Sequence, residues 1–535
     1  MPFLRPALTA PLLAALFCAT PGQTPEPAGE IVVAPPQAGR PTLLVFITVD
    51  QMRADYLDRW KGQLTGGFKR LAEGGAVFTN GHQDHAITET APGHASTLSG
   101  RFPRSTGITR NLAGVNDPNS PLIGSRALGA SPTRFRGTTL VDWLTAANPA
   151  TRALSVSSKD RGAILPIGRS KQQVYWYSAS GSFTTSKWYR DTLPDWVQAF
   201  NVRQMPQDFA GKSWDLLLPP SEYAEPDSVV AESRGRAFMF PHRFSASPDT
   251  AAAQLPGFPF MDDVTAAMAL HGIQSLELGK GPGTDVAAVS FSATDYIGHR
   301  FGPDSREVHD QILRLDRILG SFIDSLYKLR DSTRIILALT ADHGVASFPD
   351  LNTGNRTPAP SRVNLTPAIE AAVAVMRRAK ADTGAVDLES GAFLVERRPG
   401  ITPALVNESA DSFVAVARRI PGVLRADRFR DLASADFGKD PIARRWIQMF
   451  SPDIPVEATV TMAPGNYFWY YGAAQHGTPH DDDSHVPIIF YGPGFKPGRY
   501  DQFARTVDMA PTLAQVLGVT PTEPLDGKPL TAAIR

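Results

Sequence analysis

Cysteine is almost absent from this chain of 535 residues, which contains only Cys18. That residue lies in an N-terminal stretch with the pattern of an export signal, so cleavage of the signal would leave a mature protein without a thiol. Disulfide bonds and thiolate chemistry are then excluded from the mature chain. A nucleophile or a metal site must be built from other side chains.

The chain also lacks an excess of charge of either sign, with 53 Lys and Arg against 53 Asp and Glu. Without a global field to attract a polynucleotide or an anionic membrane, we expect no nucleic acid as a partner. A long apolar run is missing as well, because residues 7–19 are mostly apolar but too few to span a bilayer as a stable helix. We therefore expect no stable membrane span.

The first 40 residues have the composition of a removable leader. A positive charge precedes the apolar run, and small residues suited to cleavage follow it. We assign residues 1–22 to a signal peptide and residues 23–40, rich in Pro, Gly and Ala, to a flexible leader. The protein is then exported, either periplasmic or secreted. A lipoprotein anchored at Cys18 is the weaker alternative, because the residues before it match a lipobox poorly.

Short apolar runs predict the strands of a sheet that is buried on both faces. They cover Leu43–Val49, Ala153–Ser157, Asp285–Phe291, Ile335–Thr340 and Val486–Gly492. Helical patterns separate them, the clearest being a stripe of apolar residues from Val308 to Leu326. Strands that alternate with helices predict an α/β fold with a mainly parallel central sheet flanked by helices.

Two irregular segments interrupt this alternation within the predicted catalytic domain, which spans residues 41–535. The first, at about 165–275, is rich in aromatic residues and proline, and we expect it to form a cap outside the main sheet. The second, at about 350–470, has helical character around Pro367–Ala379 and Ser409–Ile420. Both are predicted to be cap insertions.

Candidate metal ligands follow the predicted strands. They are Asp50, Asp295, His299, Asp342, His343 and one histidine of the segment 476–485. The carboxyl ends of parallel strands meet at one edge of a sheet, where open α/β sheets place their sites. Asp295 and His299 are four residues apart, so one helical turn would bring both to the same face. Six ligands are too many for one tetrahedral metal ion and fit two.

Thr90 provides a candidate nucleophile. The Ala91-Pro92-Gly93 segment after it is expected to turn sharply, because Pro92 disfavours a helical Ala91 and Gly93 can adopt unusual dihedral angles. A short helix is expected to start at His94. A hydroxyl at a helix N-terminus can attack a phosphorus or acyl centre, because the backbone N–H groups there favour negative charge. Threonine alone is a poor nucleophile and needs a base or a metal ion.

Lys159 and Arg161 come directly after the predicted strand Ala153–Ser157. Two cations at this spacing could hold an anion from two sides. They could equally belong to a solvated turn, and the pattern alone leaves both readings open.

Together these segments resemble the alkaline phosphatase superfamily. The motifs occur in the order Asp50-Gln-Met-Arg, Thr90-Ala-Pro-Gly-His, Asn111, Lys159-Asp-Arg161-Gly, Asp295-x3-His299, Asp342-His343-Gly and His476-Gly-x-Pro. Within the superfamily, the chain is most similar to the phosphate-irrepressible alkaline phosphatases that use threonine. The resemblance extends from about residue 42 to residue 530.

This resemblance implies a function and a role for each site residue. It implies hydrolysis of small-molecule phosphate monoesters through a phosphothreonine at Thr90, with two zinc ions per chain, and we expect a monomer. One zinc would be held by Asp295, His299 and His476, and the other by Asp50, Asp342, His343 and the Thr90 oxygen. Asn111, Lys159 and Arg161 would hold the phosphoryl oxygens. His476 is preferred to His480 and His485 because its His-Gly pair carries the match.

Three other functions fit these residues less well. A phosphodiesterase similar to the nucleotide pyrophosphatases is the nearest alternative, but those enzymes lack the Lys-x-Arg pair that Lys159 and Arg161 form. A sulfatase would need a Cys or Ser where Thr90 stands. A catalytically silent, exported phosphate-binding protein belongs to a different class, and the intact ligand set argues against it.

Overall fold

The computed structural model describes residues 39–112, 114–349, 360–468 and 474–535. The predicted signal peptide, residues 1–22, and the predicted leader up to residue 38 lie outside these ranges. In the described ranges, none of the helices is both long enough and apolar enough to cross a membrane.

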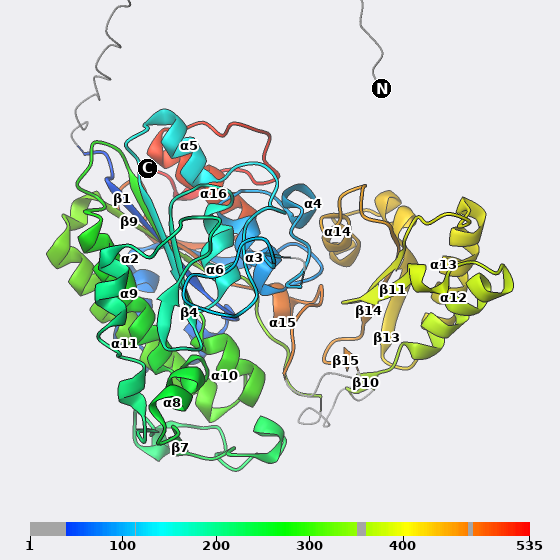
Figure 1. Ribbon diagram of the computed structural model, residues 1–535, viewed down its shortest axis with the longest axis horizontal. Coiled ribbons are helices and arrows are strands. Elements are labelled where there is room, and N and C mark those ends of the chain that lie inside the picture. The colour runs from blue at the N-terminus through cyan, green and yellow to red at the C-terminus, as the bar shows by residue number, and fades with distance from the viewer. Residues whose placement is uncertain (1–38, 113, 350–359, 469–473) are drawn as a thin grey trace, which may run out of the picture. The chain divides into compact units, whose positions relative to one another are not determined.

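A nine-stranded sheet forms the centre of the fold, in the order β17-β2-β16-β9-β1-β8-β3-β4-β5 (Figure 1). The strands are β1 Leu43–Val49, β2 Ala76–His82, β3 Ala153–Ser157, β4 Gln173–Ser178, β5 Ser182–Thr184, β8 Asp285–Phe291, β9 Ile335–Thr340, β16 Ile488–Tyr491 and β17 Gly498–Arg505. Only β16, against β2 and β9, and β5, against β4, pair antiparallel. The prediction of an α/β fold with a mainly parallel sheet is confirmed.

Helices cover both faces of this sheet (Figure 1). One layer contains α2 Gly67–Gly74, α9 Phe260–Ser275, α10 Ala293–Phe301 and α11 Arg306–Leu329, and the other contains α3 Thr90–Thr97, α5 Leu140–Ala147, α6 Asp160–Ile164 and α16 Met509–Leu517. Leu43, Val45 and Ile47 of β1 face the first layer, whereas Leu44 and Phe46 face the second. The unbroken apolar sequence of β1 therefore serves two hydrophobic cores at once.

The central sheet continues into the segment that was predicted to be a cap at about 165–275. β4 pairs parallel with β3, β5 pairs with β4, and α9 packs in the same core as β3 and β8. The prediction that this segment lies outside the main sheet is therefore wrong for these elements. The crossover from β3 to β4 contains only the five-residue helix α6 and a 3-10 turn, so no long helical pattern marked the return to the sheet.

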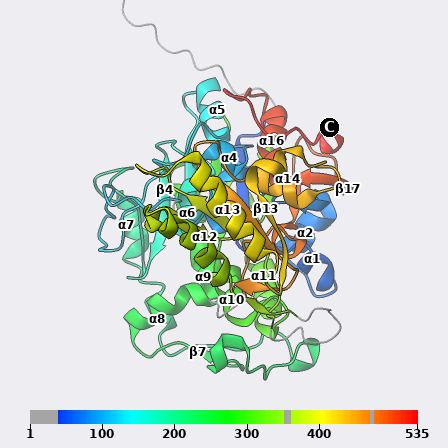
Figure 2. The same cartoon turned by 90° about the vertical axis from the view of Figure 1, so that its right-hand side faces the viewer.

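Residues 362–462, within the second predicted insertion, form a separate core around a four-stranded antiparallel sheet. Its strands, in spatial order, are β11 Val386–Glu389, β12 Ala392–Val395, β14 Val456–Met462 and β13 Val423–Arg428. Two helices, α12 Thr366–Arg378 and α13 Pro403–Ala417, lie side by side in this core (Figure 2). Both predicted helical stretches are present, and the sheet was not predicted.

A carboxylate of α11 caps the start of α2. The two oxygens of Asp316 accept hydrogen bonds from the backbone N–H groups of Thr65, Gly66, Phe68 and Lys69, at 2.6 to 3.3 Å. A negative charge at a helix N-terminus satisfies donors that the helix itself leaves unpaired. The approach is so close that a Cβ atom on Gly66 would lie 2.2 Å from the carbonyl oxygen of Asp316.

We expect Asp316→Ala to lower the free energy of unfolding by about 3 kcal/mol, because it leaves several N–H groups without an acceptor. Asp324→Asn is the matched control, since Asp324 also connects α11 to α2, through a 2.7 Å ion pair with Arg70 that is largely exposed. The control should change the free energy by less than about 0.5 kcal/mol. Thermal unfolding of both variants tests this, and equal midpoints would contradict the capping role.

Candidate functional site

The predicted ligands meet at the carboxyl edge of the parallel strands. Asp50 follows β1, Asp295 lies in α10 after β8, and Asp342 and His343 follow β9. The structure brings them together in two groups, Asp295 with His299 and His476, and Asp50 with Asp342 and His343. Within each group, one potential ligand atom of every residue lies within 4.8 Å of the others.

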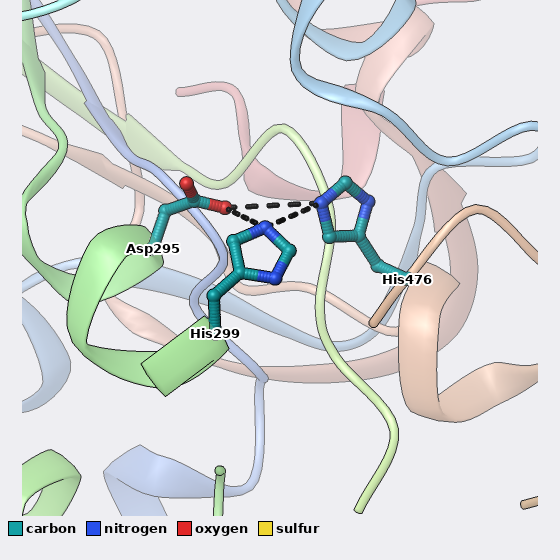
Figure 3. Close-up of side chains that lie close together, drawn as sticks. All are labelled: Asp295, His299 and His476. Atoms are coloured by element: carbon teal, nitrogen blue, oxygen red, sulfur yellow. Dashed lines mark hydrogen bonds and ion pairs between the residues drawn. The ribbon is translucent and has the colours of Figure 1, made fainter. Parts of the chain in front are cut away.

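The first group converges on one point between α10 and the segment that carries His476 (Figure 3). Oδ1 of Asp295 lies 3.3 Å from Nε2 of His299 and 3.8 Å from Nε2 of His476. The two Nε2 atoms are 3.2 Å apart. The spacing of four residues within α10 places Asp295 and His299 on the same face, as the sequence predicted.

Backbone carbonyls determine which nitrogen of each histidine faces the site. The Nδ1 atoms of His299, His343 and His476 lie 2.6 to 2.8 Å from the carbonyl oxygens of Ala474, Gly344 and Thr88, respectively. A carbonyl can only accept, so each Nδ1 carries a hydrogen, and in the neutral imidazole each Nε2 then presents a lone pair to the site. The two Nε2 atoms, 3.2 Å apart, need a proton or a metal ion between them, and with the carboxylate of Asp295 beside them they fit a metal ion.

The second group is completely buried. Nε2 of His343 lies 3.5 Å from Oδ1 of Asp50 and 3.6 Å from Oδ2 of Asp342. Oδ1 of Asp50 accepts no hydrogen bond from the described residues, which is costly for a buried carboxylate oxygen. A divalent cation would satisfy this oxygen and the imidazole nitrogen together.

Burial and neighbouring charges both shift the ionisation of these groups, and Asp295 raises the pKa of His299 against the effect of burial. It raises the pKa of Asp50 well above the ordinary value, and the charge of Asp342 raises this pKa further. Burial lowers the pKa of His343, and it lowers the pKa of His476 to well below the ordinary value, with His343 and His299 adding to the effect. Neutral imidazoles are the form that binds metal, and a bound cation favours the ionised carboxylate.

Lys159 connects the two groups. Its Nζ atom lies 2.7 Å from Oδ2 of Asp50 and 2.6 Å from Oδ2 of Asp295, and the side chain is buried. Burial lowers the pKa of Lys159, but Asp295 and Asp50 outweigh burial and hold this pKa above the ordinary value. The ammonium group is therefore charged at the centre of the site.

Arg161 has a buried donor whose hydrogen-bonding capacity is unused within the described ranges. Its Nε atom has no hydrogen-bond partner among the described residues. Burial lowers the pKa of Arg161, but Asp160 and then Asp50 raise it above the ordinary value, so the guanidinium stays charged. A charged, planar group with a free N–H is suited to a phosphate oxygen.

Thr90 is the first residue of α3, so its hydroxyl does lie at a helix N-terminus. The predicted sharp turn over 91–93 and the helix start at His94 are wrong, because the helix already includes these residues. Proline is compatible with a first helical turn, where its missing N–H is not needed. Gly93 is explained by close packing instead, since a Cβ atom there would lie 2.2 Å from the carbonyl oxygen of Asp342.

The Thr90 hydroxyl is buried next to the second group, with Oγ1 at 3.4 Å from Nε2 of His343. Asn111 lies beside the same helix turn, and its Oδ1 atom accepts a hydrogen bond of 2.8 Å from the backbone N–H of Ala91. Because Oδ1 is the acceptor, Nδ2 is the donor end of this side chain. The structure therefore places Asn111 beside the residue that follows Thr90.

Gln51 was missed by the sequence analysis. Its backbone N–H donates to Oδ1 of Asp342 at 3.0 Å, and its side-chain amide donates to Oδ1 of Asp295 at 2.8 Å. One residue therefore orients a carboxylate in each group. Its φ of 67° is unusual for a residue other than glycine. Only its position next to Asp50 could have drawn attention to it.

Thr88 was also missed, although it secures the His476 segment. Its carbonyl accepts from His476, and its hydroxyl donates to the carbonyl of Thr478 at 3.0 Å. The neighbouring histidines point elsewhere, since Nε2 of His480 bonds the carbonyl of Met462 at 2.7 Å. Nε2 of His485 bonds the carbonyl of Thr79 at 2.9 Å.

Known proteins resemble the chain over nearly all of its length. A family model described as type I phosphodiesterase / nucleotide pyrophosphatase matches residues 44–432. Alkaline phosphatase PhoV of Synechococcus elongatus is 30% identical over 98% of this chain and 98% of its own length. Alkaline phosphatase PhoK of a Sphingomonas species is 31% identical over 91% of this chain and 90% of its own length.

The fold shows the same relationship. A crystal structure of alkaline phosphatase PafA, a protein known from Elizabethkingia meningoseptica, matches with a TM-score of 0.84 and 29% identity, over 93% of this chain and 99% of that one. These relatives confirm the predicted enzyme class, a phosphatase. The chain therefore belongs to the type I phosphodiesterase / nucleotide pyrophosphatase family of the alkaline phosphatase superfamily, in the group that contains PhoV, PhoK and PafA.

Proposed function

We propose that the protein is an exported, zinc-dependent hydrolase of phosphate monoesters that forms a covalent phosphothreonine at Thr90. One observation carries the proposal: a buried hydroxyl at a helix N-terminus lies beside two groups of metal-binding residues and two charged cations. The relatives that are named alkaline phosphatases support it. The predicted leader supports export.

Two zinc ions fit the donors. Asp295, His299 and His476 would hold one ion, and Asp50, Asp342 and His343, with the Thr90 oxygen, would hold the other. Zinc accepts carboxylate oxygen and imidazole nitrogen. When bound, such ions supply positive charge that lowers the pKa of a nearby hydroxyl and stabilises charge on oxygen.

The chain's own residues then perform a double displacement. Thr90 gives up its hydroxyl proton to solvent as Oγ1 attacks phosphorus and the new O–P bond forms. The bond from phosphorus to the alcohol oxygen breaks, and the alcohol departs with a proton from solvent. Water next attacks the phosphothreonine, the Thr90 O–P bond breaks, and the hydroxyl regains a proton as inorganic phosphate is released. Asn111, Lys159 and Arg161 would hold the non-bridging oxygens throughout, since fixed donors stabilise the charge that develops there.

A phosphodiesterase is the second candidate, because the family model that matches carries that description. Lys159 and Arg161 favour the monoester. A dianionic monoester has one more negative charge than a diester, so two converging cations stabilise it more strongly. The cap role of the predicted insertion at about 350–470 and the expected monomer remain parts of this proposal.

Steady-state hydrolysis of an aryl phosphate monoester and its matched diester tests the proposal. We expect a strong preference for the monoester, loss of activity with a chelator, and recovery when zinc is added back. Preference for the diester would replace the function by phosphodiesterase. Failure of a zinc-loaded protein to cleave either would favour a binding role.

The same substrates separate the roles of the two cations. Lys159→Ala combined with Arg161→Ala should reduce kcat/KM for the monoester far more than for the diester. Lys171→Ala is the control, because Lys171 is a surface cation over the Trp188 ring. It should leave kcat/KM unchanged for both substrates. Equal losses for both substrates would assign the pair a structural role.

We expect Thr90→Ala to lower kcat by at least about a thousandfold while metal content stays close to that of the wild type. Thr97→Ala is the matched control, because this hydroxyl lies in the same helix and donates to the carbonyl of His94. Rapid-quench detection of a phosphorylated protein should succeed with the wild type only. Near-normal turnover by the Thr90 variant would remove it as the nucleophile.

His476→Ala should reduce the bound metal by about one ion per chain, measured by elemental analysis after dialysis, because it removes one of three ligands. His480→Ala is the control, as this nearby ring bonds a backbone carbonyl instead of joining the group. Equal metal content in the two variants would contradict the assignment of His476.

A further inference from the structure

A turn of the four-stranded sheet reaches the residue that precedes Thr90. Ser390 lies between β11 and β12, and its hydroxyl donates a hydrogen bond of 3.0 Å to Oε1 of Glu89. The preceding residue, Glu389, forms an ion pair with Arg110. Residues 362–462 therefore contact both Glu89 and the neighbour of Asn111 through two consecutive side chains.

The second oxygen of Glu89 is bonded to the Asn111 segment. Oε2 accepts from the backbone N–H of Asn111 at 2.7 Å, and Oδ1 of Asn111 accepts from the backbone N–H of Ala91 at 2.8 Å. Both ends of Asn111 are therefore held, its backbone by Glu89 and its carbonyl oxygen by α3. The remaining donor, Nδ2, is directed by these two bonds.

Glu89 does not behave as an ordinary helix cap. It occupies the N-cap position of α3, yet its side chain makes no capping hydrogen bond. A cap would bond the second or third N–H of the helix, and this carboxylate extends to Ser390 and Asn111 instead. Stabilisation of α3 alone therefore does not explain its orientation.

The turn that delivers Ser390 is tightly held. Ser390 and Gly391 have φ of 47° and 84°, in the left-handed region. A Cβ atom on Gly391 would lie 2.6 Å from the carbonyl oxygen of Val460 in β14, so the turn is packed directly against its own sheet. A non-glycine residue is uncommon in this conformation, and here it projects the hydroxyl to Glu89.

We propose that Glu89 is a positioning residue for phosphoryl binding, held by Ser390 and acting through Asn111. The four-stranded sheet thereby contributes to the geometry of the phosphoryl-binding residues without touching the substrate. The inference rests on the proposed function in one respect, the role of Asn111 in binding the phosphoryl group.

Alanine and glutamine at position 89 give the first test. Glu89→Ala removes both acceptors and should lower kcat/KM for an aryl monoester by about ten- to a hundredfold, with a similar weakening of inhibition by inorganic phosphate. Glu89→Gln should recover activity to within about threefold, because glutamine can accept from Asn111 and donate to Ser390. Metal content should be unchanged in both variants. Failure of glutamine to rescue, or loss of metal, would overturn the proposal.

A double-mutant cycle with Asn111→Ala distinguishes positioning from a general structural effect. If Glu89 acts through Asn111, adding Glu89→Ala to Asn111→Ala should lower kcat/KM by no more than about a further twofold. Full additivity with an impaired Asn111→Ala variant would overturn this inference alone. Wild-type kcat/KM for Asn111→Ala would instead show that the proposed role of Asn111 fails, and this inference with it.

Ser390→Ala tests the connection from the sheet without altering the site. We expect a three- to tenfold lower kcat/KM, about the effect of losing one ordinary hydrogen bond. Ser213→Ala is the matched control, because that hydroxyl donates to an exposed carboxylate, Asp215, at 2.6 Å. The control should have the same kcat/KM as the wild type. Equal activity of both serine variants would remove Ser390 from the proposal and leave the sheet without a role at Asn111.

Discussion

Mutual repulsion among buried carboxylates is the constraint on which the site depends. Asp50, Asp295 and Asp342 are all nearly or completely excluded from solvent. Three such charges cannot share a small dry volume without cations, because repulsion in a low dielectric is strong. Lys159 and Arg161 supply positive charge directly. The three inward-facing imidazole nitrogens would do so by holding a metal cation.

The parallel sheet is what brings these groups together. β1, β8 and β9 are neighbours, so the residues that follow them are delivered to a common edge although they lie far apart in the sequence. The two hydrophobic cores make that edge rigid, since alternate residues of β1 are anchored in opposite layers. A rigid support is needed because the ligand distances tolerate only small errors.

The sequence predicted the parts whose signals are local and periodic. The central strands β1, β3, β8 and β9 follow the predicted boundaries, because each is a continuous apolar run. The tail strand β17 was not recognised, since its residues are mostly polar and exposed at the edge of the sheet. The four-stranded sheet was missed for a related reason: its pairings connect distant segments, such as β12 with β14.

The residues of the site also divide into those with a local sequence signal and those without one. Motifs and family resemblance pointed to the residues that the structure gathers in two groups at the edge of the sheet. Gln51, Thr88 and Glu89 act instead through hydrogen bonds that only the folded chain forms. The start of α3 was misplaced because Pro92 was treated as a barrier to helix, although it lies in the first turn. Positioning residues leave little trace in a single sequence, since their chemistry is ordinary and their partners are distant.

Three consecutive residues, 88–90, each serve a different part of the site. Thr88 holds His476, a proposed metal ligand, Glu89 holds Asn111, and Thr90 carries the proposed nucleophile. Successive residues at the start of a helix cannot be displaced independently, because one backbone connects them. A change at this short segment would therefore alter metal geometry, phosphoryl contacts and nucleophile placement in concert. A substitution that changes only one of these properties must therefore fall on a residue that contacts the segment. Those contacting residues lie on separate elements and can be replaced one at a time.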